Sequence, residues 1–198
     1  MTKYIICTVL IVLWIYLLSV FKRAGLHFWR FIAGSFGLFI FLMALARPLL
    51  AQPLAKAVAS VSGLVGSLTN AFSVYFKYGI IFIESAAGAI TLQIDLECSG
   101  IIEIIAFVSL LAFFKVYTVN ERIALGVLGS MYIILVNSLR IICICLIIHF
   151  FGSGAYFVSH TIIGRLVFCV FYTLLYFCVF TKSQIIRMKI GKFAYAHS

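Results

Sequence analysis

The chain has 198 residues, of which 65% are apolar and only 10% are charged, and its mean hydropathy is +1.23. A soluble domain carries about 25% charged residues, so this chain has too few polar side chains to cover a globule in water. The composition excludes a water-soluble enzyme, a disordered tail and a secreted disulfide scaffold. The net charge of +10 would suggest nucleic-acid binding in a soluble protein. Here the basic residues lie between apolar runs, where the positive-inside rule and anionic lipids account for most of them, so we expect a lipid bilayer and no nucleic-acid partner.

Five apolar runs are long enough to be membrane-spanning helices, which need about 20 residues. They are Tyr4 to Phe21, Phe28 to Ala46, Ile101 to Val116, Ile123 to about Phe151, and Thr161 to Thr181. The first run lacks a small-residue cleavage site and ends in Lys22 and Arg23, so we expect a retained anchor and not a signal peptide. The fourth run is too long for one straight span and is expected to tilt or to leave the lipid near His149 and Gly152.

Residues 47–97 have a different pattern from the rest of the chain. From Leu54 to Phe76, small polar residues recur at helical spacing, which predicts an amphipathic helix. This helix either lies in the interface, which we favour, or spans the membrane with its polar stripe facing other helices. After Gly79, apolar Ile80 to Ile83, a turn at Ser85 to Gly88, and strict alternation up to Leu96 predict a β-hairpin.

These patterns predict an all-α polytopic membrane protein with five or six transmembrane helices, an outer-face amphipathic helix and a small β-hairpin. We interpret the chain as one integral membrane domain in four parts. They are an N-terminal helix pair (1–46), an extracytoplasmic helix and hairpin insert (47–97), catalytic helices (98–181) and a basic cytoplasmic tail (182–198).

The basic residues of the tail predict the orientation of the chain. The last span is followed by four cations, Lys182, Arg187, Lys189 and Lys192, so the C-terminus is expected in the cytoplasm. With an interfacial helix there are five spans and the N-terminus lies outside. With a spanning helix there are six and it lies inside. Both arrangements place Cys98 at the outer face of the plasma membrane.

Cys98 differs from the other cysteines in its surroundings. The remaining five lie inside apolar runs, where a thiol behaves as a small hydrophobe; they are Cys7, Cys143, Cys145, Cys169 and Cys178. No CxxC pair and no Cys/His ligand spacing occurs in the sequence, so we expect neither a disulfide framework nor a metal site, and no cofactor.

Charged groups in apolar helices cost about 2.5 to 3.5 kcal/mol each on insertion scales, so each is a candidate functional residue. Such groups are Glu103, Arg140, His160 and Arg165. Arg140 lies 18 residues beyond Arg122, about 27 Å along a helix from the cytoplasmic side. His160 and Arg165 begin the last span at the same level, and Cys98 begins the third. Three helices are therefore expected to bring a thiol, a guanidinium and an imidazole to one depth.

This set of groups is what acyl transfer through a thiol requires. A thiolate must form and a fixed donor must stabilise the oxyanion. We expect Cys98 to be the nucleophile, His160 the general base and then the acid, and Arg140 the oxyanion donor or the group that holds the substrate carbonyl. Ser99 and Gly100 place the thiol at a helix N-terminus, where free N–H groups favour a thiolate.

Three segments of the chain carry a resemblance to a known family. They are Glu97-Cys98-Ser99-Gly100-Ile101 after the hairpin, Asn137-Ser138-Leu139-Arg140-Ile141 in a later helix, and His160 at the start of the last helix. Over roughly residues 79–181 the chain resembles the exosortase/archaeosortase family of membrane transpeptidases, and its short length is similar to the small Gram-positive type labelled XrtG. By position, the family's nucleophile falls on Cys98, its arginine on Arg140 and its third catalytic residue on His160.

The resemblance implies a cysteine peptidase and transpeptidase acting on membrane-anchored proteins. Their C-terminal sorting signal consists of a short motif, a transmembrane helix and a basic tail. Cleavage at the outer face through a thioester would be followed by transfer to a cell-envelope acceptor.

Each residue also has an alternative role. Cys98 could be structural, Arg140 could snorkel to the interface, and His160 could be a solvated cap, with His149 as the next candidate base. The remaining roles are supporting ones. Arg165 is a second substrate clamp or a lipid phosphate contact, Glu103 a structural partner for Arg140 or Arg165, and Asn137 a residue that orients Arg140.

Three other functions are alternatives to this interpretation. A transporter or lipid-translocating protein would need charged groups through the full depth and internal repeats, whereas the polar groups cluster near one face. A haem protein would use His149 and His160 as axial ligands. A non-catalytic membrane assembly subunit could retain the same fold.

Overall fold

The computed structural model describes residues 2–85, 88–94 and 98–185. Its main elements are α1 (Thr2–Arg23), α2 (His27–Thr69), β1 (Phe72–Tyr75), β2 (Ile80–Ser85), β3 (Gly88–Gln93), α3 (Ile101–Phe113), α4 (Val119–Phe151) and α5 (Gly164–Tyr176). A 3₁₀ turn, η1 (Ser153–Ala155), follows α4, and two π-helical segments, η2 (Val158–Ile163) and η3 (Phe177–Lys182), extend α5 at its two ends. Glu97 of the first motif and the tail residues Arg187, Lys189 and Lys192 lie outside the described residues.

The prediction of a mostly helical, polytopic membrane fold is confirmed. Among the described residues, four helical segments are long and apolar enough to cross a membrane: His27–Leu45, Leu49–Thr69, Val119–Phe151 and Ser153–Ile185. Helix α3 ends at Phe113, three residues before the predicted end at Val116. Helix α4 begins earlier than the apolar run, at Val119, because Thr118 and Glu121 form a capping box that satisfies the first N–H groups.

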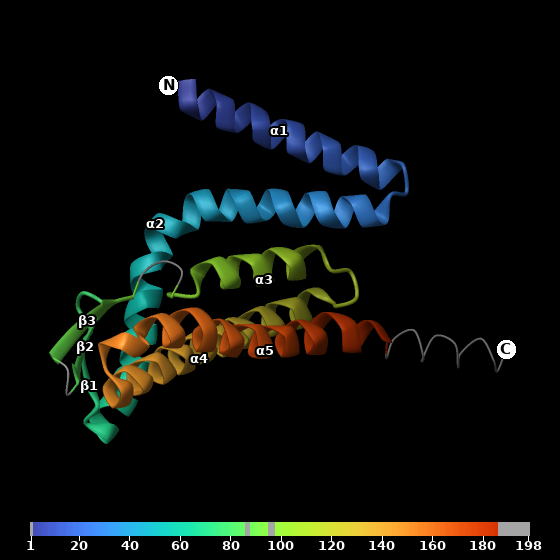
Figure 1. The fold of residues 1–198 in the computed structure, drawn as a ribbon. Coiled ribbons are helices and arrows are strands. Elements are labelled where there is room, and N and C mark those ends of the chain that lie inside the picture. Colours follow the sequence, from blue (N-terminus) through green and yellow to red (C-terminus); the bar gives the residue numbers. More distant parts are fainter. Residues whose placement is uncertain (1, 86–87, 95–97, 186–198) are drawn as a thin grey trace, which may run out of the picture.

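Helix α2 is one continuous helix of 43 residues that changes direction midway (Figure 1). Its first half runs alongside α1 and α3, whereas its second half turns across one end of the helix bundle, next to the sheet. The bend separates His27–Leu45 from Leu49–Thr69, and Pro48 and Pro53 lie in this part of the chain. Proline removes a helical hydrogen bond and kinks a helix, so the bend has a local cause.

The prediction that the helix starting near Leu54 continues to Phe76 is wrong, because α2 ends at Thr69. Asn70 adopts a left-handed conformation (φ 51°) that ends α2, and the next residues form β1, a strand that the sequence did not predict. The strand packs on a glycine-lined face of α2, where a Cβ at Gly66 would lie 2.6 Å from the carbonyl oxygen of Phe72. The glycine therefore permits the close approach of helix and strand.

The predicted β-hairpin is confirmed as β2 and β3, and β1 adds a third antiparallel strand in the order β1-β2-β3. Ile81 and Ile83 of β2 are fully buried, with Ile141, Ile144 and Ile148 of α4 in the same apolar cluster. The sheet is thus fixed to the end of α4 by alternating isoleucines, as a half-buried strand requires.

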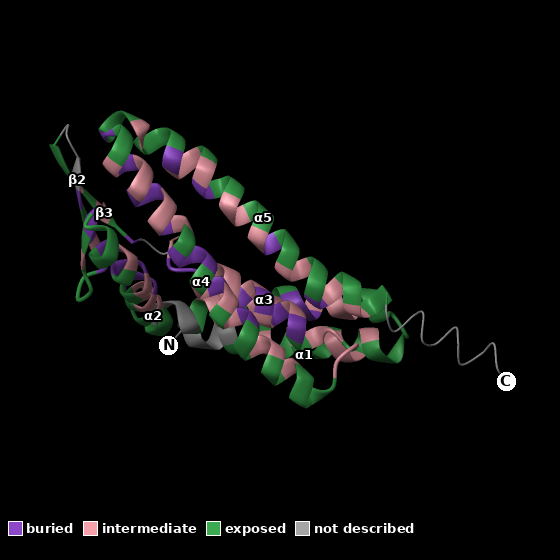
Figure 2. Cartoon of the chain, turned by 90° about the horizontal axis from the view of Figure 1, so that it is seen from below, coloured by how far each residue is buried: buried purple, intermediate pink, exposed green. Residues whose placement is uncertain are grey.

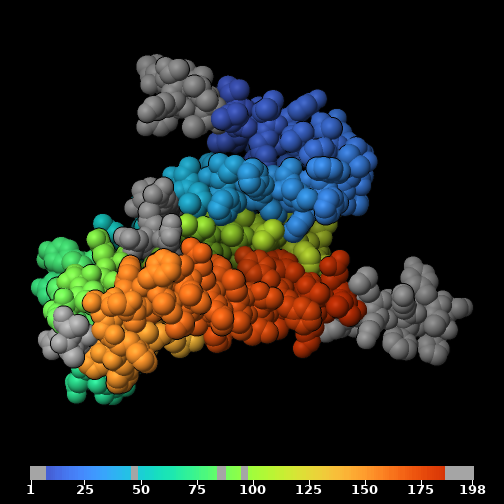
Figure 3. Space-filling model, viewed as in Figure 1, coloured from blue at the N-terminus to red at the C-terminus, as the bar shows by residue number. Residues whose placement is uncertain are grey.

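Small residues allow the helices of the bundle to pack closely. Trp14 of α1 donates a hydrogen bond from Nε1 to the carbonyl oxygen of Ala33 (2.8 Å), and its ring covers Gly37 of α2. The ring of Phe113 in α3 covers Gly34 in the same way. Helix α1 and the first half of α2 form an outer layer on α3 (Figure 3). The buried residues concentrate along α3 and the adjoining part of α4 (Figure 2).

Candidate active site

The turn that precedes α3 carries the candidate nucleophile. Cys98 is half-buried and packs against the apolar cluster between the sheet and α4. Ser99 is only 1% exposed, and Gly100 is the N-terminal cap of α3 with a left-handed backbone (φ 78°). A Cβ at Gly100 would overlap Nδ2 of Asn137. Position 100 therefore requires glycine for two reasons, its backbone conformation and its contact with α4.

Asn137 joins three helices at this level. Its side chain is 1% exposed, lies against Gly100, and donates a hydrogen bond from Nδ2 to the hydroxyl oxygen of Tyr172 in α5 (3.0 Å). Tyr172 is also within electrostatic range of Glu103 and Arg140. The sequence interpretation missed Tyr172, because an aromatic residue in an apolar run is ordinarily lipid-facing.

Arg140 lies one helical turn beyond Asn137, on the sheet side of it. Its Nε is buried and has no hydrogen-bond partner among the described residues. Gly164, the first residue of α5, lies beside it, and a Cβ there would be 3.2 Å from Nε and 3.4 Å from the carbonyl oxygen of Ser159. A buried donor without a partner costs about 1–3 kcal/mol or more. Such a group requires an explanation, and a ligand that supplies the acceptor is one.

His160 lies in the π-helical segment η2, directly after Ser159 and one turn before Gly164. The imidazole is half-buried and stacks on the ring of Tyr156 (centroids 5.6 Å apart, 18° between planes). π-Helical turns often occur at functional sites, because the inserted residue shifts the side chains that follow it. The alternative base, His149, lies in the last turn of α4 and contacts the ring of Phe150.

The two remaining predicted residues, Glu103 and Arg165, lie in the first turns of α3 and α5. Glu103 is in the first turn of α3 and is within electrostatic range of Tyr172 and Tyr176. Arg165, in contrast, is exposed at the start of α5. Within the described ranges, no group of three or more His, Cys, Asp or Glu residues could hold a metal ion.

The described contacts thus connect the Cys98 turn to Asn137, Asn137 to Tyr172, and Arg140 to the segment that carries His160. The fold is therefore that of a polytopic membrane protein. A thiol, a partly buried guanidinium and an imidazole lie on the sheet-side half of its helices.

A comparison with protein-family models supports the same conclusion from the sequence. The model of the transmembrane exosortases (Exosortase_EpsH) matches residues 3–177. The chain therefore belongs to the transmembrane exosortase family. No curated protein and no solved structure matches the chain.

Proposed function

We propose that the chain is a cysteine transpeptidase that cleaves the C-terminal sorting signal of exported proteins and transfers them to a cell-envelope acceptor. The observation that carries the proposal is Arg140, whose buried Nε lacks a partner among the described residues. Its Nε lies beside Gly164, which follows the His160 segment, and Asn137, which contacts the turn after Cys98, is one helical turn earlier in α4. A buried donor that is unsatisfied among the described residues is what an oxyanion site needs, and this one lies beside the residue that follows the segment of the candidate base. Membership of the exosortase family agrees with this chemistry.

In the first half of the reaction, the thiol of Cys98 gives its proton to His160, and the thiolate attacks the carbonyl carbon of the scissile peptide bond. The charge that develops on the carbonyl oxygen accepts hydrogen bonds from the guanidinium of Arg140. When the C–N bond breaks, His160 returns the proton to the leaving amine of the sorting signal. Cys98 then carries the new C-terminus of the substrate as a thioester.

In the second half, the acceptor nucleophile loses its proton to His160 as it attacks the thioester carbonyl. Arg140 stabilises the oxyanion again, the C–S bond breaks and the thiolate of Cys98 is regenerated. Apolar surroundings keep water scarce near the thioester, so the acceptor competes with hydrolysis.

The proposal places the sheet end of the bundle at the outer face of the plasma membrane. Six basic residues support this orientation because they lie at the opposite end, where α1 ends, α2 begins, α3 connects to α4, and η3 ends (Figure 1). They are Lys22, Arg23, Arg30, Lys115, Arg122 and Lys182. Basic residues mark the cytoplasmic side. With the second half of α2 lying across the outer interface, the chain has five spans and an outer N-terminus.

The test is mass spectrometry of the enzyme after incubation with a tagged substrate and an acid quench. The substrate would carry a short motif, an apolar helix and a basic tail. We expect a substrate-sized adduct on Cys98 that hydroxylamine releases, and no adduct or processing in Cys98→Ala. Cys169→Ala, which removes an exposed thiol of α5, is the matched control and should process substrate normally. Unchanged processing in Cys98→Ala would disprove the cysteine mechanism.

A further inference from the structure

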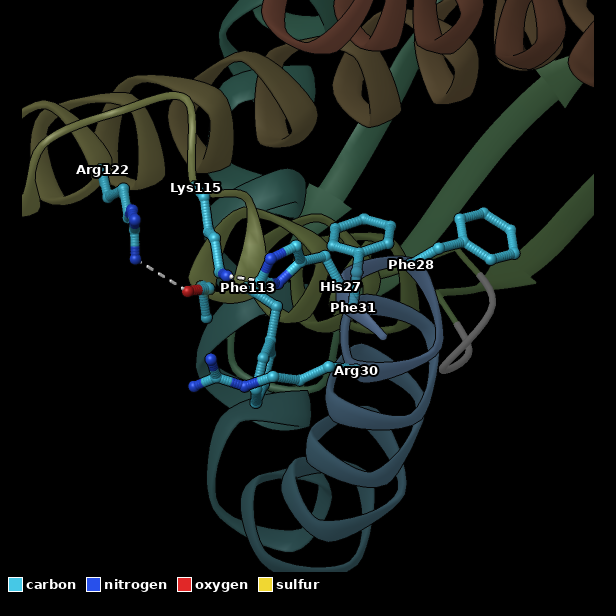
Figure 4. A pocket seen from close by; sticks show the side chains of 8 residues that line it. His27, Phe28, Arg30, Phe31, Phe113, Lys115 and Arg122 are labelled. Carbon is cyan, nitrogen blue, oxygen red and sulfur yellow. Dashed lines mark hydrogen bonds between the residues drawn. The ribbon is translucent and has the colours of Figure 1, made fainter. Parts of the chain in front are cut away.

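A second site lies at the end of the bundle opposite the sheet. A cavity of about 380 Å³ opens between the start of α2, the end of α3 and the start of α4 (Figure 4). Its polar lining comes from four basic side chains, His27, Arg30, Lys115 and Arg122. In the described part of the chain no acidic residue lines it.

The basic side chains are brought together by the fold and are not scattered on the surface. The ammonium group of Lys115 donates to Nδ1 of His27 (3.1 Å), although the two residues are 88 positions apart. Arg122 donates from Nη1 to the carbonyl oxygen of Ala112 and from Nε to that of Tyr117 (both 3.0 Å). These bonds fix its guanidinium at the α3–α4 connection.

Arg30 supplies the fourth group. It is half-buried on the first turn of α2, and its guanidinium has no hydrogen bond or ion pair among the described residues. Several cations around one cavity repel each other unless an anion lies between them. The arrangement therefore favours a negatively charged ligand.

The apolar part of the lining indicates what kind of anion fits. Phe28, Phe31 and Phe113 form walls of the same cavity, and Phe28 is exposed on the outer surface of α2. A free phosphate ion would gain nothing from aromatic walls. A phospholipid would place its phosphate among the cations and the first part of its chains against the rings, as in basic pockets between transmembrane helices.

We propose that this cavity binds the phosphate head group of an anionic phospholipid. The site lies at the opposite end of the molecule from Cys98, so it does not depend on the proposed chemistry. A bound lipid would join the α1–α2 connection to the α3–α4 connection through one phosphate.

The experiment is native mass spectrometry of the delipidated full-length protein titrated with dioleoyl phosphatidylglycerol. The pocket variant is Arg30→Gln with Lys115→Gln. The matched control is Lys22→Gln with Arg23→Gln, which removes two exposed charges from the same end but not from the cavity. We expect about tenfold weaker binding for the pocket variant and little change for the control.

Two further binding measurements identify the kind of ligand. Dioleoyl phosphatidylcholine should bind about tenfold more weakly than phosphatidylglycerol, and inorganic phosphate at the same concentration should not displace the bound lipid. Equal losses of phosphatidylglycerol affinity in the two double variants would show a diffuse charge effect and overturn the proposed site. Equal binding of phosphatidylcholine, or displacement by inorganic phosphate, would overturn the lipid assignment. If the pocket variant is unstable, Lys115→Gln alone, at an exposed position, provides the same comparison.

Discussion

Gly100 combines a backbone requirement with a packing requirement, and the two can be separated by experiment. Gly25 has a similar left-handed conformation (φ 69°) but no atom near its missing Cβ, whereas a Cβ at Gly100 would overlap Asn137. We expect Gly25→Ala to lower the free energy of unfolding by about 1 kcal/mol, the cost of the conformation alone. Gly100→Ala should cost about 1–3 kcal/mol more and disturb the Cys98 turn. Thermal unfolding in detergent measures both, and equal losses would show that the Asn137 contact is unimportant.

Arg140 is the residue whose proposed role depends most on the shape of its side chain. Arg140→Lys retains the charge but loses Nε and the planar pair of donors. We expect turnover to fall about a hundredfold or more while the protein remains inserted and folded. Arg23→Lys, the same change at an exposed position at the other end of the bundle, is the control. Wild-type turnover in the Arg140→Lys variant would identify Arg140 as an interfacial anchor.

At the scale of helices, Tyr172 connects α5 to α4. Tyr172→Phe removes the hydroxyl that accepts the hydrogen bond of Asn137 and leaves a buried amide without a partner, so we expect a loss of about 1–3 kcal/mol in stability. We also expect lower activity, because Asn137 contacts the Cys98 turn. Tyr176→Phe is the matched control, since Tyr176 packs by its ring against Phe107 and Phe180. Comparable melting temperatures for the two variants would contradict a linking role for the Tyr172 hydroxyl.

The elements that could be predicted from the sequence are those in which apolar residues alternate regularly or form long runs. The alternation after Gly79 predicted β2 and β3, and long apolar runs predicted the helices. The strand β1 could not be predicted, because Phe72–Tyr75 is short and continues the apolar spacing of α2. The boundary depends on one left-handed residue, Asn70, which the helical pattern does not reveal.

The sequence indicates which residues are candidates for the site. It does not indicate which contacts join the segments that carry them. Cys98, Arg140 and His160 are recognisable because polar groups are rare in apolar helices. The contacts that join their segments involve Gly100, Gly164 and Tyr172. Gly164 and Tyr172 are ordinary residues of a membrane helix, and only tertiary packing gives them a role here.

For the whole molecule, the proposed orientation predicts which end is accessible from outside the cell. In a cysteine-free background, Lys77→Cys lies at the exposed β1–β2 turn, and Asn120→Cys is exposed at the start of α4. A membrane-impermeant thiol reagent applied to intact cells should label position 77, and should label position 120 only after permeabilisation. The reverse pattern would overturn the orientation and the outer location of the proposed reaction.

Helix α4 is longer than the hydrocarbon layer is thick. Its 33 residues extend for about 50 Å, compared with about 30 Å for the hydrocarbon core. Its last turns, including Ile144 and Ile148, are buried in the cluster formed with the sheet, so the surplus length lies at the sheet end. A helix with surplus length tilts more in a thin bilayer and less in a thick one. If the chain has the proposed orientation and function, the height of the Cys98 turn above the lipid would vary with acyl-chain length, and membranes of different thickness would present a different bond of the same substrate for cleavage.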